Sequence, residues 1–144
     1  MDEELASAVR TRLASTDQRF TAGRQALVTT LLGAGRPLTA AEVLEASGLA
    51  QSSAYRNLTL LESCGVVHRL SSTDEFARFE LAHDLTDHHH HHLICTACGS
   101  VADFTASDGL EQSLADAMRV VNDALDFHAV DHRLDLLGLC ADCH

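Results

Sequence analysis

The chain has 144 residues, of which 46% are hydrophobic, enough for one compact domain or two small ones. No apolar run approaches the roughly 18 residues of a membrane-spanning helix, which argues against a membrane protein. The first four residues include three acids, unlike a basic secretory signal, so we expect a cytoplasmic protein.

The formal net charge of −11 is distributed unevenly along the chain. Residues 1–82 contain eight Arg against ten acidic residues, a net of −2, whereas residues 83–144 contain two Arg against eleven, a net of −9. All ten basic residues are Arg. The first part can therefore bind DNA through clustered Arg, while the acidic second part suits the collection of metal cations.

The first part of the chain predicts short helices followed by a hairpin. Apolar spacing and capping residues predict helices over residues 2–14, from Thr21 to the break at Gly33, over 40–46 and over 51–63. Two strands, 66–70 and 76–81, then flank a turn. This order of elements is typical of a winged helix-turn-helix domain, which we assign to residues 1–81.

In such domains the second helix of the turn enters the major groove, and basic residues nearby hold phosphates. The candidate DNA-binding residues are polar or basic and lie on or near the predicted helices: Arg19, Arg24, Ser52, Ser53, Tyr55, Arg56 and Asn57. The alternative is that these residues form ordinary solvated helix faces.

After a polar, acidic hinge over residues 82–87, residues 88–144 predict a small α/β domain. Its expected elements are a strand over 88–95, a strand over 101–104, a helix over 110–123 and a strand over 127–137. The whole chain is therefore expected to have an α+β fold, with the second domain carrying metal sites.

Two C-x-x-C pairs predict a structural zinc site. Cys95 and Cys98 form one pair, and Cys140 and Cys143 form the other. Two such pairs supply the four thiolates of a closed tetrahedral zinc site, and in a reducing compartment this is favoured over disulfides.

The five consecutive histidines at 88–92 predict further metal sites. Because side chains alternate along a strand, His90 and His92 share one face, and His89 and His91 share the other. The first pair can join His68 and His83, with Glu80 as the alternative ligand, in a site that links the two domains. The second pair can join Glu111 and His132.

Two other functional classes were weighed against a regulator. A His-rich site with a nearby Glu could activate water in an enzyme, but the chain has enough ligands to close each site and has no nucleophile motif. A metal storage or delivery protein would not need the Arg-bearing winged helix. We therefore expect neither an enzyme nor a small-molecule substrate.

Several motifs, in this order and spacing, resemble the ferric uptake regulator family of bacterial metal-dependent repressors, over about residues 19–143. They are Arg19-Phe-Thr-Ala-Gly-Arg-Gln25, Ala54-Tyr-Arg-Asn-Leu58, the stretch from His88 to Gly99 followed by Val101-Ala-Asp-Phe104, and His132 with Gly138-Leu-Cys140 and Cys143. The zinc-responsive branch is the most similar.

The resemblance implies a homodimer that closes onto a palindromic, double-stranded DNA operator when metal binds. It implies structural zinc at the four cysteines, a second regulatory site at His89, His91, Glu111 and His132, and a sensing site that includes His90 and His92. Asp103 matches a carboxylate ligand of peroxide-sensing members. Because neutral imidazoles suit zinc, nickel or cobalt better than manganese, we predict regulatory Zn²⁺, with nickel or iron as alternatives.

Overall fold

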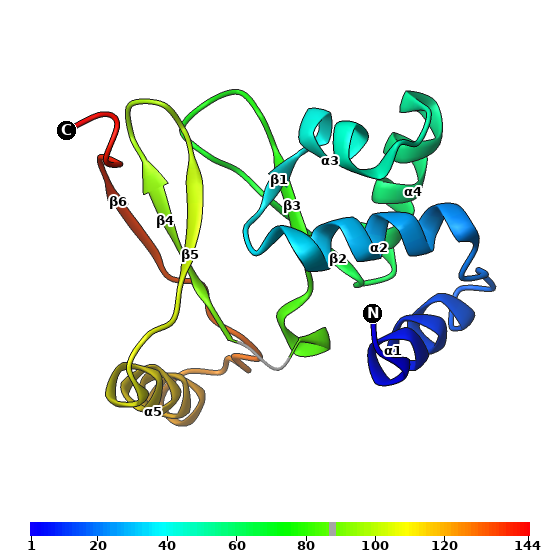
Figure 1. The fold of residues 1–144 in the computed structure, drawn as a ribbon. Helices are drawn as coiled ribbons and strands as arrows, with labels where there is room; N and C mark the ends of the chain where they lie inside the picture. Colours follow the sequence, from blue (N-terminus) through cyan, green and yellow to red (C-terminus); the bar gives the residue numbers. More distant parts are fainter. Residues whose placement is uncertain (87–88) are drawn as a thin grey trace.

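The computed structural model describes residues 1–86 and 89–144. Figure 1 shows two groups of elements side by side: helices α1 to α4 with one three-stranded sheet, and a second three-stranded sheet with helix α5. Helices and sheets are thus combined in the α+β arrangement that the sequence predicts. Within the described part of the chain, no helix is long and apolar enough to cross a membrane.

The first group of helices begins and ends close to the predicted residues. These helices are α1 (Glu3–Ala14), α2 (Ala22–Ala34), α3 (Ala40–Ser47) and α4 (Gln51–Ser63). Asp2, Thr21 and Thr39 cap the first three by accepting a backbone N–H three residues on. Helices α2 and α3 end at glycines in the left-handed conformation, Gly35 and Gly48.

The predicted hairpin forms, with a third strand that the sequence analysis missed. Strands β2 (Val67–Leu70) and β3 (Arg78–Leu81) pair antiparallel, and β1 (Leu38–Thr39) pairs with the other edge of β3. A two-residue strand has no detectable periodicity, and Thr39 also serves as the cap of α3. Helices and hairpin together form the winged helix.

The main cluster of buried apolar side chains, which forms the hydrophobic core, lies within residues 5–81. Helix α1 contributes Leu5, Val9 and Leu13, helix α2 contributes Leu27, Val28 and Leu31, and the rest come from α3, α4 and the sheet. The first part of the chain therefore has a core of its own.

The second sheet has the order β5-β4-β6. Its strands are β4 (His91–Cys95), β5 (Val101–Phe104) and β6 (Asp135–Gly138). Strand β5 pairs antiparallel with β4, whereas β6 pairs parallel with it. Helix α5 (Asp108–Ala124) lies beyond one end of this sheet and has no buried residue, so its apolar side is open.

Two expectations for this region need correction. The strand predicted over 88–95 begins only at His91, and residues 87–88 lie outside the described residues. The strand predicted over 127–137 is limited to 135–138, because β4 offers a partner over only a few residues. The predicted hinge contains a short 3₁₀ turn, η1 (His83–Leu85).

Candidate metal centres and DNA-binding helix

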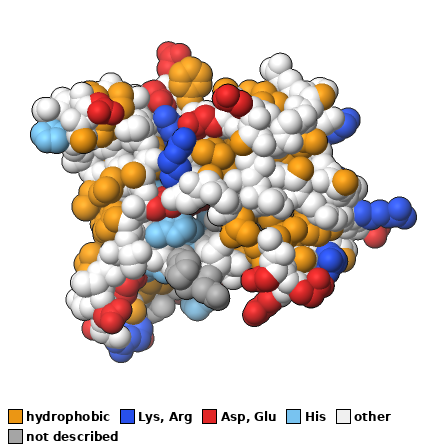
Figure 2. Space-filling model, in the orientation of Figure 1, with side chains coloured by type: hydrophobic (Ala, Val, Ile, Leu, Met, Phe, Trp, Pro, Cys, Tyr) orange, Lys and Arg blue, Asp and Glu red, His pale blue; other side chains and the backbone are white. Residues whose placement is uncertain are grey.

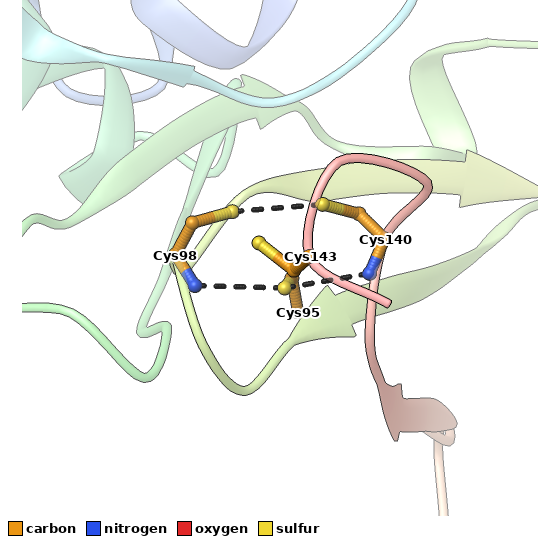
Figure 3. A group of neighbouring side chains, drawn as sticks. All are labelled: Cys95, Cys98, Cys140 and Cys143. Carbon is orange, nitrogen blue, oxygen red and sulfur yellow. Dashed lines mark hydrogen bonds between the residues drawn. The ribbon is translucent and has the colours of Figure 1, made fainter.

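The four cysteines lie together at one end of the second sheet (Figure 3). Cys95 ends β4 and Cys98 lies in the turn that leads to β5, whereas Cys140 and Cys143 follow β6. Parallel pairing of β4 with β6 places both pairs at the same end, with Cys95 opposite Gly138. The four sulfur atoms lie within 4.8 Å of one another.

The geometry and chemistry of this group fit a tetrahedral zinc ion. With zinc–sulfur bonds of about 2.3 Å, the sulfur atoms of such a site are about 3.8 Å apart. The Sγ atoms of Cys98 and Cys140 are 3.8 Å apart. The backbone N–H groups of Cys98 and Cys140 point at Cys95 Sγ and lower the pKa of that thiol to about 6. The other thiols raise the pKa of Cys143 to about 12, a conflict between neighbouring thiolates that a cation relieves.

A second group joins the two parts of the chain around the carboxylate of Glu80. This residue lies on β3, and its oxygen atoms are 2.9 Å from His83 Nε2, 3.2 Å from His90 Nε2 and 3.0 Å from His92 Nε2. His83 lies in η1, whereas His90 and His92 come from the start of the second sheet. Three imidazoles and one carboxylate thus converge on one point.

The charges of this group are strongly coupled. Burial by itself would raise the pKa of Glu80, but its contacts with His83 and His92 outweigh burial and hold that pKa well below its usual range. The contact with Glu80 raises the pKa of His83. The carboxylate therefore stays charged and attracts either imidazolium protons or a metal cation.

Two buried polar atoms beside this group lack a hydrogen bond among the described residues: His92 Nδ1 and Asp103 Oδ1. The Asp103 carboxylate lies 3.4 Å from His90 Nε2 and 3.7 Å from His92 Nε2, and burial raises its pKa. A cation among these imidazoles would compensate the orphaned carboxylate oxygen. Asp135 Oδ1, 3.5 Å from His92 Nδ1, is a neighbour that sequence reasoning missed.

The expected set of His68, His83, His90 and His92 is not the one that comes together. Glu80 and His83 both belong to the compact group, so they are not alternatives, and His68 lies outside it. His68 pairs with Glu80 across strands β2 and β3, and its ring centroid is 5.7 Å from that of His83. Its neighbour Glu80 holds the central position instead.

A third group contains His89, His91, Glu111 and His132, as expected. His91 Nε2 is 2.6 Å from Glu111 Oε1, and His89 Nε2 is 3.0 Å from His132 Nε2. Glu111 comes from the first turn of α5. Three ring nitrogens and a carboxylate that converge in this way are ligands that a divalent cation accepts. Figure 2 shows histidine side chains at the surface between the two parts of the molecule.

Alternation along the histidine run separates these two groups. His89 and His91 turn to the Glu111 side, whereas His90 and His92 turn to the Glu80 side. The strand-like alternation holds although residues 89 and 90 precede β4. The groups are close, because the ring centroids of His83 and His89 are 5.5 Å apart.

The predicted recognition helix is α4, and the polar side of this helix is exposed to solvent. Ser52, Tyr55 and Arg56 are exposed and Ser53 is half-buried, while Ala54, Leu58 and Leu61 face the core. Arg19 is exposed just before α2.

Two of the predicted DNA-binding residues bond to each other. Arg24 Nε donates to Asn57 Oδ1 at 3.1 Å, and other nitrogens of Arg24 bond to the Arg19 carbonyl and to Gln18. This pair therefore fixes α2 against α4. Because both side chains already have partners within the protein, their contact with DNA stays a prediction.

The chain is similar to known metal-responsive regulators. A sequence profile described as the ferric uptake regulator family matches residues 15–137. The peroxide-responsive repressor PerR of Staphylococcus saprophyticus is 30% identical over 138 residues, covering 92% of this chain and 87% of the relative.

Solved structures agree. The Helicobacter pylori ferric uptake regulator Fur has a TM-score of 0.73 and 23% identity, covering 98% of this chain and 92% of that one, which supports the fold. The holo form of XcZur has a TM-score of 0.54 and 28% identity, covering 98% of this chain and 97% of that one. Because the family profile covers most of the sequence, this chain belongs to the ferric uptake regulator family of metal-responsive, DNA-binding transcription regulators.

Proposed function

We propose that this protein is a zinc-responsive repressor that binds a palindromic operator as a metal-loaded homodimer in the cytoplasm. The group around Glu80 is its sensor, the four cysteines hold a structural zinc ion, and the group around Glu111 is a second regulatory site. The proposal rests mainly on one observation: Glu80 of the winged helix lies within 3.2 Å of His90 and His92, which belong to the other part of the chain.

A cation at this position would connect the two parts directly. Strand β3 carries Glu80 within the sheet that supports α4, whereas β4 carries His92 within the sheet that holds the cysteines. Metal that binds the DNA-competent arrangement more tightly raises the population of that arrangement. A tenfold difference in metal affinity corresponds to about 1.4 kcal/mol, within the usual range of allosteric coupling.

Zinc is the first choice of signal. Three imidazole nitrogens and one carboxylate oxygen form a four-ligand set of the type that zinc accepts. The similarity to holo XcZur, together with the closed four-cysteine group nearby, supports this assignment.

Iron(II) is the second candidate, and the position of Asp103 favours it. With its carboxylate 3.4 Å from His90 Nε2, Asp103 can add a second oxygen ligand to the set. More oxygen ligands suit iron or manganese better than zinc. Asp103 also matches a carboxylate ligand of peroxide-sensing members of the family, and PerR, to which the chain is similar, is a peroxide-responsive repressor.

Operator binding in metal-buffered solutions tests the proposal. The operator would be selected from random-sequence DNA with zinc, nickel, manganese and iron(II) all present, and binding would be measured by fluorescence anisotropy with each metal separately. We expect zinc to activate binding at the lowest free concentration, in the wild type and in Asp103→Asn alike. Activation by iron(II) where zinc is silent, lost in Asp103→Asn, would reassign the signal. Binding without metal dependence would contradict a sensing role.

A further inference from the structure

The loop between β2 and β3, residues 71–77, reaches the turn that carries the first cysteine pair. In Figure 1 this green loop runs beside the connection from β4 to β5. Thr73 Oγ1 donates a hydrogen bond of 2.7 Å to the carbonyl oxygen of Cys95, and Ser72 Oγ donates one of 2.6 Å to that of Gly99. The two hydrogen bonds therefore attach the loop to the first and last residues of the turn formed by residues 95–99. We call this turn the cysteine turn.

The loop also fits the cysteine turn sterically. Asp74 lies so close to Gly99 that a Cβ atom there would be 2.5 Å from the Asp74 carboxylate carbon, and Gly99 has a φ of 78°. Arg78 holds Asp74 with two hydrogen bonds of 2.8 Å each. Because the Arg78 side chain is only 9% exposed, this ion pair is well fixed. Asp74 therefore occupies, in a fixed position, the space that a side chain at residue 99 would need.

The same loop is poorly suited to contact DNA. Residues 71–77 read Ser-Ser-Thr-Asp-Glu-Phe-Ala, with two acids and no basic residue. The nearest cation along the chain, Arg78, is neutralised by Asp74. Phosphate binding requires basic or neutral donors, and here the two hydroxyls of Ser72 and Thr73 are already committed to the cysteine turn.

We propose that the β2–β3 loop is a strut that docks the winged helix on the cysteine turn, instead of a wing that touches DNA. The two parts of the molecule are then held at both ends of β4: Glu80 contacts His92 near its start, and Thr73 bonds to Cys95 at its end. His92 and Cys95 are three residues apart on the strand, so the two attachment points are separated by about 10 Å. Two separated points prevent a rotation of one part of the molecule against the other that a single point would allow. The four-cysteine group thereby sets the orientation of α4 as well as holding its own fold.

The test removes the two hydroxyls while keeping side-chain shape, in the full-length, zinc-loaded protein with the variant Ser72→Ala/Thr73→Val. We expect faster amide hydrogen exchange across residues 95–100, faster zinc removal by a chromogenic chelator, and operator affinity reduced five- to tenfold. The dependence of operator affinity on salt should stay unchanged, because no phosphate contact is lost. Glu75→Gln, which changes an exposed acid of the same loop, is the matched control and should match the wild type in hydrogen exchange and zinc removal.

A second pair of variants tests the contact between the loop and the cysteine turn if Ser72→Ala/Thr73→Val folds poorly. Gly99→Ala and Gly48→Ala both place a side chain at positive φ, but only the first meets a neighbour, Asp74. We expect Gly99→Ala alone to speed exchange in the β2–β3 loop.

Two outcomes would overturn the strut. Unchanged exchange and zinc removal in the double variant would show that the loop does not hold the cysteine turn. A loss of operator affinity with a smaller salt dependence and unchanged exchange would show that the loop contacts DNA. The affinity measurement relies on the DNA binding proposed above, whereas the exchange measurement does not, so the two can fail separately.

Discussion

Glu80 is the residue on which the proposed sensor depends, because its single carboxylate contacts three imidazoles from two segments of the chain. Of these imidazoles, His90 is the most informative to remove. It precedes β4, so it is not needed for sheet pairing, and its side chain is still 19% exposed.

We predict that His90→Ala leaves a folded protein with a weakened metal response. Loss of one of four ligands should reduce zinc-dependent operator affinity at least tenfold, about 1.4 kcal/mol, with little change in thermal stability. The exposed His128, which lies outside the three groups, supplies the control His128→Ala. Anisotropy with operator at fixed free zinc is the measurement, and equal affinity of His90→Ala and wild type would contradict the sensor assignment.

At the scale of elements, the start of α3 gives the clearest pH dependence. Thr39 and Glu42 form a reciprocal capping box, and Arg36 also binds the Glu42 carboxylate at 2.8 Å. Mainly through the hydrogen bond from Arg36, the pKa of Glu42 is lowered to about 2 from 4.5. A lowered folded-state pKa means that the carboxylate stabilises the folded protein above about pH 4.5, and this contribution is lost as pH falls towards 2.

Glu42→Gln should therefore be less stable than the wild type at pH 7, by about 0.5–1 kcal/mol for a partly exposed cap and ion pair. The difference should shrink as the pH falls from 4.5 towards 2. Urea unfolding followed by circular dichroism at each pH measures it, and comparison at equal pH cancels any acid release of metal common to both proteins. Glu45→Gln, on the exposed side of the same helix, is the control. A difference that is constant with pH would contradict the role of the Glu42 charge.

At the scale of the whole molecule, the two parts are stabilised differently. Residues 5–81 supply a continuous apolar core, whereas the second sheet buries few apolar side chains and α5 buries none. The exposed fractions of Leu136, Leu137 and Leu139 are 50%, 67% and 53%. We therefore propose that the second part depends on bound metal and on a partner subunit for much of its stability.

We predict that Cys95→Ser unfolds the second part while the first stays folded. Amide hydrogen exchange should lose protection over β4, β5 and α5 and keep it in α2 and α4. Cys64→Ser, outside the four-cysteine group, is the matched control. A Cys95→Ser protein that remains dimeric by sedimentation and retains protection throughout would refute a structural role for the zinc site, and would also argue against the proposed division at residues 82–87.

The sequence was sufficient for elements with strong local signals. Capping residues such as Thr21 and Thr39 and terminal glycines gave the helices, and the C-x-x-C spacing gave the four-cysteine group. The sequence was insufficient where the structure depends on contacts between segments that are far apart in the chain. The choice among His68, Glu80 and His83 depends on how β3 faces β4, and the end of β6 depends on the length of its partner. The contacts of Ser72 and Thr73 have no local signal at all.

The alternation of the histidine run has a consequence for how such sequences can change over time. His89 and His90 are neighbours that belong to different clusters, and so are His91 and His92. Because the run holds five histidines, deleting one of them leaves four directly before Leu93, and alternation still gives two imidazoles to each face. Descendants of this gene should therefore tolerate the loss of one histidine from the run, whereas a substitution at 89, 90, 91 or 92 removes a ligand from one cluster and leaves the other complete.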